Sequence, residues 1–359
     1  MRTKISANGL SVKAYAGTTG VLLAFNIDDA LRPGFLGFAI ERWDGQKKEW
    51  LSGMIPFPDM PRIPGQLIPS NQAPFQKFRW SDYRVYPDRE YEYTIYPVYG
   101  SSQLPKLEQS ITVKVKTAGV SSGEHSVIFN RAAAASQAFS RKFPEVEAAL
   151  EQARKAKAPA PDLPVEALNW LSRGVLEQIT GFIQLATDAT WGLDIAIYEY
   201  ELPAIIEAVN AAHARGVRVR IVYHAKAGDP QTAENQANLQ GLPALSLRPR
   251  ETKSICHHKF IVLSQMQGGN PSPIAVLCGS TNFTPNGVYR QANVVHVARQ
   301  ADVAQEYLVL FETLFRGDSP ADTRTYITAN NPIPGSGNPF VGFSPRKGKT
   351  DLNHFSNLI

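Results

Sequence analysis

The sequence predicts two domains, an all-β sandwich followed by an α/β domain whose mixed sheet is flanked by helices. Short aromatic and β-branched runs, separated by turn residues, fill residues 1–118. A linker of small and polar residues follows at 119–124, and over residues 125–330 strand-like runs alternate with helical patterns. The 359 residues are enough to bury two hydrophobic cores.

The strands expected in the first domain are short and contain few turn residues. They are SVKAYAG, GVLLAFNID, LGFAIERWD, YEYTIYPVYG and SITVKVKT. The Pro-rich segment from Pro56 to Pro74 is too irregular for strands, so we expect a long loop there. A flap that contacts a substrate or partner and a passive surface loop are both open interpretations of it.

The segment from Phe78 to Gly100 resembles part of a known domain family. In fibronectin type III domains a strand ends in a Pro-containing corner, and a Tyr, here Tyr91, opens the next strand. The resemblance implies a fibronectin type III-like β-sandwich over residues 1–118. Such a sandwich would serve as a recognition or spacer module, without an indication of its ligand.

The second domain is predicted to open with a strand at Val127–Phe129, followed by an Ala-rich helix. A second helix at Val165–Leu185 carries apolar residues at helical spacing, which indicates a core-facing side. Leu193–Tyr223 reads as strand, helix and strand. A strand at Asn293–Ala298 and a helix at Asp302–Phe315 complete the expected elements.

Two polar clusters lie at the ends of apolar runs within Cys256–Phe283. His257-His258-Lys259 directly precedes the run FIVL. Because side chains alternate along a strand, His257 and Lys259 should point together while His258 points away. The second cluster, Gly279-Ser280-Thr281-Asn282, follows the run that begins IAVL.

If these two strands lie side by side, an imidazole, an ammonium, a hydroxyl and an amide converge at one sheet edge. Such a set suits a phosphodiester, because a neutral imidazole can attack phosphorus while Lys, Asn and Ser donors hold the charged oxygens. This chemistry needs no metal, so we expect neither a metal nor another cofactor.

The H-x-K of residues 257–259, followed by the G-S-x-N of 279–282, resembles the signature of the phospholipase D superfamily, which includes metal-independent nucleases. The pattern of residues 193–223 is similar to the βαβ unit that precedes H-x-K in that family. The resemblance implies a phospholipase D-like catalytic repeat over residues 125–330.

It also implies residue roles. His257 would be the nucleophile and form a phosphohistidine, Lys259 and Asn282 would bind the phosphate, and Ser280 would be a supporting donor.

Four further residues are candidate substrate contacts. Gly279 and Thr281 belong to the second motif itself. Asn130 and Arg131 follow the first predicted strand of the α/β domain, which should end at the same edge of the sheet.

The chain departs from the family pattern at two supporting carboxylates. Ser264 stands where the family has Asp, five residues after the motif Lys, and Asn293 stands where many members have Glu. Without these two negative charges to support it, the imidazole would be less basic. A catalytically degenerate binding protein on the same fold is therefore the alternative interpretation.

A second H-x-K, His224-Ala225-Lys226, lacks both a following apolar run and a G-S-x-N partner. We interpret it as the start of a loop after a strand; a contact with the substrate is the alternative interpretation.

The number of motifs bears on the mechanism. Family members place two motifs face to face, from two repeats or from a homodimer, so that one His attacks and the other protonates the leaving oxygen. This chain offers one such His, so the second half-site would come from a dimer partner or another polypeptide.

The C-terminal tail suggests a further source. Pro339–Phe355 has the same layout as His125–Phe139: an apolar strand ending in Phe, a short polar group with Arg, and a helix start. Residues 331–359 are therefore expected to resemble the beginning of a second, truncated repeat. Coincidence between two short segments is the alternative.

The composition leaves two substrate classes open. A net charge of +5 is compatible with a polyanionic or membrane partner. Basic stretches at 215–220, 248–253 and 346–349 would suit nucleic acid. Apolar residues of the Pro-rich loop would suit a phospholipid interface; they are Phe57, Ile63, Leu67 and Phe75.

No run has the length and apolar character of a transmembrane helix or a signal peptide. Two cysteines, Cys256 and Cys278, do not make a disulfide scaffold. We therefore expect a cytoplasmic protein with two reduced, buried thiols.

Overall fold

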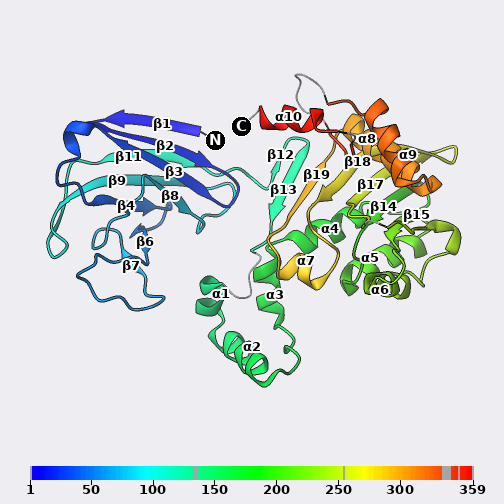
Figure 1. Cartoon of the computed structure of the whole chain (residues 1–359), viewed down its shortest axis with the longest axis horizontal. Coiled ribbons are helices and arrows are strands. Elements are labelled where there is room, and N and C mark those ends of the chain that lie inside the picture. Colours follow the sequence, from blue (N-terminus) through cyan, green and yellow to red (C-terminus); the bar gives the residue numbers. More distant parts are fainter. Residues whose placement is uncertain (1, 132–135, 254, 334–340, 347, 358–359) are drawn as a thin grey trace. The chain divides into compact units, whose positions relative to one another are not determined.

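The computed structural model describes residues 2–131, 136–253, 255–333, 341–346 and 348–357. The chain divides into two compact units, Met1–Ser122 and Gly123–Ile359. The first unit is coloured from blue to cyan in Figure 1, and the second from cyan to red. The boundary between them falls inside the predicted linker at 119–124.

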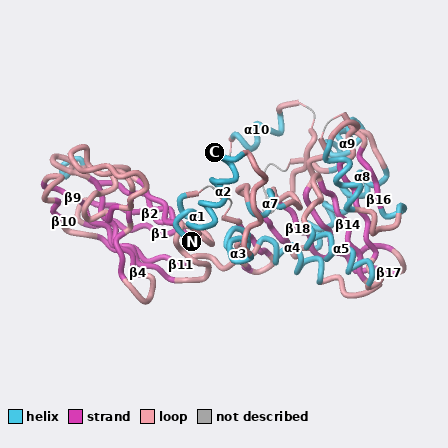
Figure 2. The backbone as a smooth tube through the Cα atoms, turned by 90° about the horizontal axis from the view of Figure 1, so that it is seen from below, coloured by secondary structure: helices cyan, strands magenta, loops and turns pink. Residues whose placement is uncertain are grey.

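The first unit is built from strands and loops (Figure 2). One antiparallel sheet has the order β1-β2-β3-β8, and another has the order β10-β9-β4-β5, with β11 also paired to β9. A two-stranded sheet joins β6 and β7. The strands are β1 (Arg2–Ala7), β2 (Leu10–Ala16), β3 (Val21–Ile27), β4 (Gly37–Trp43), β5 (Lys48–Trp50), β6 (Ser52–Gly53), β7 (Ile68–Pro69), β8 (Arg79–Asp82), β9 (Glu90–Gly100), β10 (Pro105–Leu107) and β11 (Ile111–Lys116), with a short 3-10 turn at Asp29–Leu31.

Alternation of apolar and polar residues places one side of each strand in the core of this unit. In β11, for example, Ile111, Val113 and Val115 are buried and the residues between them are exposed. Tyr91 lies at the start of β9, and its hydroxyl accepts a hydrogen bond of 2.8 Å from the backbone N–H of Tyr86. The sequence therefore correctly predicted a β-rich N-terminal region.

The Pro-rich segment is partly built into this core. Phe57 and Phe75 are buried, and Phe75 stacks on Trp80 with ring centroids 3.7 Å apart. Ile63 and Leu67 are exposed. Two of the four residues expected to form an apolar rim are therefore core residues, because their rings fill space beside the sheet.

The second unit is built on a mixed eight-stranded sheet with the order β12-β13-β19-β18-β17-β14-β15-β16, of which only β12 comes from the two residues directly before the unit begins. Strands β14, β15 and β16 are parallel to one another, whereas β13 and β19, β19 and β18, β18 and β17, and β17 and β14 pair in antiparallel fashion. The strands are β12 (Ser121–Ser122), β13 (His125–Phe129), β14 (Trp191–Ile197), β15 (Arg218–His224), β16 (Leu247–Arg250), β17 (Lys259–Gln267), β18 (Asn270–Gly279) and β19 (Val294–Ala298).

Helices cover both faces of this sheet (Figure 2). On β14, Ile195 belongs to the hydrophobic cluster that includes α4 and α5, whereas its neighbour Ala196 belongs to the cluster that includes α8. The helices are α1 (Gln137–Lys142), α2 (Pro144–Ala156), α3 (Val165–Ser172), α4 (Val175–Gln184), α5 (Pro203–Ala214), α6 (Pro230–Asn238), α7 (Pro285–Tyr289), α8 (Ala301–Arg316), α9 (Pro320–Asn330) and α10 (Thr350–Ser356), with a 3-10 turn at Ala244–Ser246.

The prediction of one helix over Val165–Leu185 was wrong. Two helices, α3 and α4, occupy this range, because Arg173 and Gly174 both have positive φ angles, 53° and 95°. The hydroxyl of Ser172 accepts a hydrogen bond of 3.0 Å from the Leu176 N–H and so satisfies a donor at the start of α4. The sequence Ser-Arg-Gly carries this break, although the apolar spacing continues across it.

The tail has a helix but no strand among its described residues. Residues 341–346 form no regular element, and α10 follows. Phe343 packs edge-on against Tyr307 of α8, with ring centroids 4.9 Å apart. The start of the strand expected from Pro339 lies outside the described residues. Of the features that the sequence shares with His125–Phe139, the described part of the tail has the helix and not the strand.

None of the helices in the described ranges combines the length and apolar character needed to span a bilayer. Both cysteines are free; Cys256 is buried, as expected, while Cys278 is half-buried.

Candidate active site

The two motifs meet at one edge of the sheet. Strands β17 and β18 are antiparallel neighbours, and Phe260 pairs with Cys278. The start of β17 and the end of β18 therefore lie side by side. The end of β14 lies at the same edge, because Ile197 pairs with Lys259. Three segments contribute: residues 256–259, 279–283 and 198–202.

His257 is exposed at this edge, where its ring lies against Tyr198 with centroids 5.0 Å apart. Partial burial, together with the positive charge of Lys259, lowers the pKa of His257 below its usual value. The imidazole is therefore neutral at pH 7, which is the form that can attack phosphorus.

Lys259 is buried, and its Nζ lies 5.3 Å from the centre of the Tyr198 ring. The ammonium donates a hydrogen bond of 3.2 Å to the backbone carbonyl of His257. Burial lowers the pKa of Lys259 to about 8, and the negative charge of Glu199 opposes this shift. Lys259 is thus still largely protonated at pH 7.

His258 is half-buried, and its ring packs against Phe260, with centroids 6.0 Å apart. Burial lowers the pKa of His258 to about 4, which keeps this ring neutral. Phe260 belongs to the hydrophobic cluster that includes α8, so His258 lies on the α8 face of the sheet. His257 and Lys259, in contrast, both contact Tyr198.

Three residues of the second motif shape the turn into β19. The Ser280 hydroxyl donates to Asn293 Oδ1 at 2.8 Å and accepts from the Val294 N–H at 3.1 Å. The Thr281 hydroxyl donates to the Val294 carbonyl at 3.1 Å. A Cβ on Gly279 would lie 2.1 Å from that same carbonyl oxygen, so no larger residue fits there.

We expect Gly279→Ala to lower the free energy of unfolding by at least about 2 kcal/mol, because the added methyl group overlaps a paired backbone carbonyl. Gly181→Ala in α4 is the matched control, since a Cβ there meets nothing within 4 Å. That change should stabilise the protein by about 0.5–1 kcal/mol. Urea unfolding of both variants measures the difference, and equal midpoints would contradict the close approach at Gly279.

Asn282 is buried and donates a hydrogen bond from Nδ2 to the Glu199 carboxylate. Its Oδ1 has no hydrogen-bond partner within the part of the chain that the structure describes. Close packing holds the Asn282 backbone, because a Cβ on Gly287 of α7 would lie 2.3 Å from the Asn282 carbonyl oxygen.

Glu199 is a site residue that the sequence analysis did not predict. It is half-buried, next to Asn282 and within electrostatic reach of Lys259. Burial raises the pKa of Glu199 above its usual value, and the nearby Glu201 adds to the shift. The sequence feature that could have pointed to Glu199 is its position two residues after the strand that ends at Ile197.

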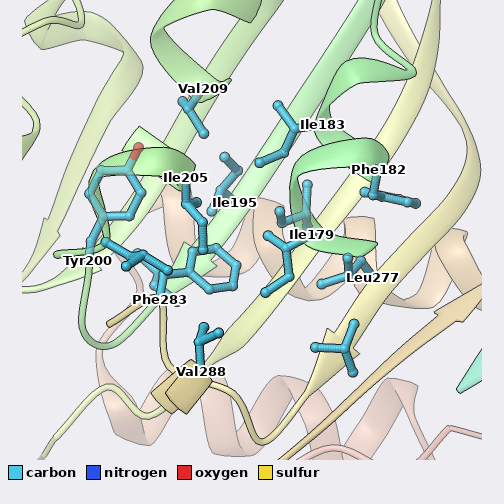
Figure 3. Packing of buried hydrophobic residues seen from close by; sticks show 14 of the residues in the cluster. Ile179, Phe182, Ile183, Ile195, Tyr200, Ile205, Val209, Leu277, Phe283 and Val288 are labelled. Atoms are coloured by element: carbon cyan, nitrogen blue, oxygen red, sulfur yellow. The ribbon is translucent and has the colours of Figure 1, made fainter. Parts of the chain in front are cut away.

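Backbone hydrogen bonds fix Glu199 beside the motif. The Phe283 N–H donates to the Glu199 carbonyl at 3.1 Å, and the N–H groups of Glu201 and Leu202 donate to the Phe283 carbonyl at 2.8 and 2.7 Å. Phe283 and Tyr200 are both buried in the hydrophobic cluster shown in Figure 3. The apolar core thus anchors both segments that carry the polar edge.

A buried amide, Asn235 of α6, ties the end of β14 to the end of β15. Its Oδ1 accepts from the Tyr200 N–H at 3.0 Å, and its Nδ2 donates to the carbonyls of Tyr198 and His224 at 2.9 and 3.0 Å. Three backbone groups near the site depend on this one side chain.

Asn235→Ala should therefore lower the free energy of unfolding by about 2–3 kcal/mol, because it leaves several buried polar groups without partners. Asn238→Ala is the control: its Nδ2 makes a single bond, to the Tyr200 carbonyl, and its loss should remove about 1 kcal/mol. Thermal unfolding distinguishes the two, and similar losses in both variants would argue against the role of Asn235.

His224, the histidine of the second H-x-K sequence, is buried and supports the backbone next to the first H-x-K motif. Its Nδ1 accepts a hydrogen bond of 3.2 Å from the Cys256 N–H, so the ring proton resides on Nε2, which lies 3.1 Å from the Asp229 carboxylate. His224 thereby holds the residue directly before His257, in line with the interpretation that it is not a second catalytic motif.

Asn130 and Arg131 make structural contacts. Asn130 Nδ2 lies within hydrogen-bond distance of the backbone carbonyls of Gly287, Val288 and Gln291, while its Oδ1 accepts from the Asn293 N–H. Arg131 donates to the Trp170 carbonyl at 2.9 Å and lies over the Trp170 ring. These contacts stand in place of the substrate contacts expected for both residues.

The two departures from the family pattern have different surroundings. Ser264 is buried in β17, and its hydroxyl finds no hydrogen-bond partner among the described residues. It lies five residues along the strand from Lys259, about 16 Å away. Asn293 donates to the Gly287 carbonyl at 2.8 Å, so it stabilises the turn that follows β18.

Over the described ranges, His, Cys, Asp and Glu side chains form no group of three or more that is suited to a metal ion.

Comparison with known proteins places this site in a family context. Residues 182–315 match the family model described as cardiolipin synthase, PLD-like domain. Two relatives named mitochondrial cardiolipin hydrolase, from Xenopus tropicalis and Homo sapiens, are 25 % and 24 % identical over 133 and 132 residues. Each alignment covers 36 % of this chain and 57 % or 47 % of the relative, so the chain spans about half their length.

Solved structures show weaker similarity. Nuc from Salmonella typhimurium, a phospholipase D family member, has 23 % identity and a TM-score of 0.31 over 38 % of this chain and 83 % of its own. NucT from Helicobacter pylori has 16 % identity and a TM-score of 0.32 over 40 % and 89 %.

The part of the second unit that the family model matches, residues 182–315, is thus similar to a phospholipase D-like domain. At this low identity, the family model and the two relatives indicate similarity to the phospholipase D superfamily as a whole and not to one particular activity.

Proposed function

We propose that this protein is a phosphodiesterase that works without a metal and forms a phosphohistidine at His257. The proposal rests on one observation: an exposed, neutral imidazole, a buried ammonium and a buried amide come together at one edge of the sheet. His257 is the nucleophile, and Lys259 and Asn282 hold the phosphate oxygens. Ser280 supports the turn that carries Asn282.

The reaction needs a second acid–base group, which protonates the leaving oxygen and later activates water. In the mechanism implied by the family resemblance, that group is a second His. A homodimer partner or another polypeptide is one source of it, and a residue of this chain is another.

Phospholipid is the substrate class that the described surfaces favour. A cavity of about 590 Å³ lies on the α8 side of the sheet, lined by His257 and His258 together with two arginines and apolar side chains; Lys259 and Asn282 are not among its lining residues. Arg250, Arg324, Ile255, Leu310, Leu314 and Phe343 are among the lining residues. An anionic headgroup on an apolar body matches such a lining. Two of the relatives are named cardiolipin hydrolases, which points the same way.

Several basic residues expected to bind nucleic acid are engaged within the protein. Arg218 and Arg220 form ion pairs of 2.8 and 2.7 Å with the buried Asp194, and Arg220 also pairs with Glu312. The Arg248 guanidinium donates to the Phe315 carbonyl at 2.6 Å. These contacts reduce the positive charge available for a phosphate backbone.

The alternative is a catalytically degenerate binding protein on the same fold, motivated by Ser264 and Asn293. For the first unit we propose a fibronectin type III-like sandwich, supported by the hydrogen bond between the Tyr91 hydroxyl and the Tyr86 N–H. We also propose a cytoplasmic location.

The test is hydrolysis of bis(p-nitrophenyl) phosphate by the full chain after treatment with EDTA. We expect the rate to be unchanged by EDTA, because the proposed chemistry uses no metal. A short-chain phosphatidylglycerol and a single-stranded oligonucleotide, compared at equal phosphodiester concentration, separate the two substrate classes. Activity that EDTA abolishes would contradict the proposed mechanism, and no activity on any of the three would favour the binding protein.

A further inference from the structure

The Glu199 carboxylate lies among the groups proposed to bind the phosphate. It accepts a hydrogen bond from Asn282 Nδ2, and its negative charge acts on the Lys259 ammonium. The backbone on either side is fixed, because residues 199–202 exchange three hydrogen bonds with Phe283. Glu199 is therefore held at the reacting edge of the sheet and cannot be displaced without breaking these contacts.

An ionised carboxylate at this place would repel a phosphodiester. Burial is the largest cause that disfavours this anion, and the charges of Glu201 and Asp229 act in the same direction. The Lys259 charge and the hydrogen bond from Asn282 oppose them, and the pKa of Glu199 is raised on balance. A substrate bound to Lys259 and Asn282 would bring a further negative charge, so the protonated carboxyl is the form compatible with bound substrate.

We infer that Glu199 is the general acid of this site and performs, within one chain, the role that a second His has in the mechanism implied by the family resemblance. The inference rests on the proposed function and deepens it. It follows from the position of the carboxyl group, which accepts a hydrogen bond from one proposed phosphate ligand, Asn282, and acts electrostatically on the other, Lys259.

The two half-reactions balance as follows. A ring nitrogen of His257 attacks phosphorus, the bond from phosphorus to the leaving oxygen breaks, and the Glu199 proton passes to that oxygen to give an alcohol. Glu199 is then a carboxylate and accepts a proton from the water that attacks the phosphohistidine. The phosphorus–nitrogen bond breaks, which restores neutral His257 and protonated Glu199.

A general acid is needed in proportion to the basicity of the leaving group. p-Nitrophenolate leaves readily as an anion, whereas phenolate needs a proton. The test therefore compares Glu199→Gln with the wild type on bis(p-nitrophenyl) phosphate and on diphenyl phosphate. Gln keeps the size of Glu and an oxygen that can accept from Asn282, but it cannot donate an acidic proton.

For Glu199→Gln we expect kcat to fall about 100-fold or more on diphenyl phosphate and by less than about threefold on bis(p-nitrophenyl) phosphate. Glu199→Asp should recover part of the loss on diphenyl phosphate. Glu147→Gln is the control: it removes a half-buried carboxylate of α2, outside the three segments that form the site, and it should leave the ratio of the two rates near that of the wild type.

Equal losses on both substrates would overturn the acid role and leave Glu199 as a support for Asn282. No loss on either substrate would also overturn it and would point to an acid supplied by another chain. A wild type that hydrolyses neither diester would overturn the proposed function and, with it, the role of Glu199.

Discussion

His257→Asn is expected to lose at least about 10⁴-fold of the phosphodiester hydrolysis rate, because the reaction then has no nucleophile. Asn approximates the polarity and part of the shape of His, and the exposed ring packs against Tyr198. The fold should therefore survive the change. The rate is measured with bis(p-nitrophenyl) phosphate in EDTA, alongside the thermal unfolding curve.

His213→Asn is the control for a general effect of losing an imidazole. His213 lies on α5, away from the three segments that form the site, and its replacement should leave the rate within about twofold. If His257→Asn kept a rate close to that of the wild type, another group would be the nucleophile and the assignment of His257 would be wrong.

Lys259→Met is expected to lower kcat/KM about 10²–10³-fold, because a buried positive charge that holds the phosphate is removed. The same ammonium gives the wild type an alkaline limit. With a pKa of about 8, Lys259 is charged below pH 8 and neutral above it. Activity on bis(p-nitrophenyl) phosphate should therefore decline as the pH rises through about 8.

At the acidic end, activity should decline once the pH falls below the lowered pKa of His257, because the imidazolium cannot attack. The profile of kcat/KM against pH tests both limits. Lys259→Arg keeps its charge throughout this range, so its alkaline limit should move upward. An alkaline limit that stays near pH 8 in Lys259→Arg would show that another group sets it.

Local patterns in the sequence were sufficient to predict the candidate catalytic edge. The alternation of His257, His258 and Lys259 follows from the two-residue period of a strand. In the structure, His258 packs against Phe260 on the α8 face of the sheet. Antiparallel pairing of β17 with β18 then brings Asn282 to the same edge. Both steps need only the apolar runs that flank the motifs.

Contacts between distant segments could not be predicted in this way. Glu199 meets Asn282 across 83 residues, through the pairing of residues 199–202 with Phe283. Asn130 was expected at the substrate because its strand ends near the site, but its amide meets the α7 region 157 or more residues away. Neither the spacing of the motifs nor the composition of the chain indicates which distant residues come into contact.

Buried charges gave a similar difficulty. Arg218 and Arg220 appear in the sequence as a basic strand available to a polyanion. In the structure both pair with Asp194, which is fully buried on the neighbouring strand β14. The register of β14 against β15 decides this contact, since Asp194 pairs with Arg220.

Trapping of the covalent intermediate tests the central claim most directly. The full chain is mixed with bis(p-nitrophenyl) phosphate, quenched in alkali within the first turnover, and analysed by peptide mass spectrometry. We predict a p-nitrophenylphosphoryl adduct on the peptide that contains His257, because one p-nitrophenolate leaves and the other stays on phosphorus, and no adduct in His257→Asn. An active protein that carries no adduct, or carries it on another residue, would contradict catalysis through a phosphohistidine at His257.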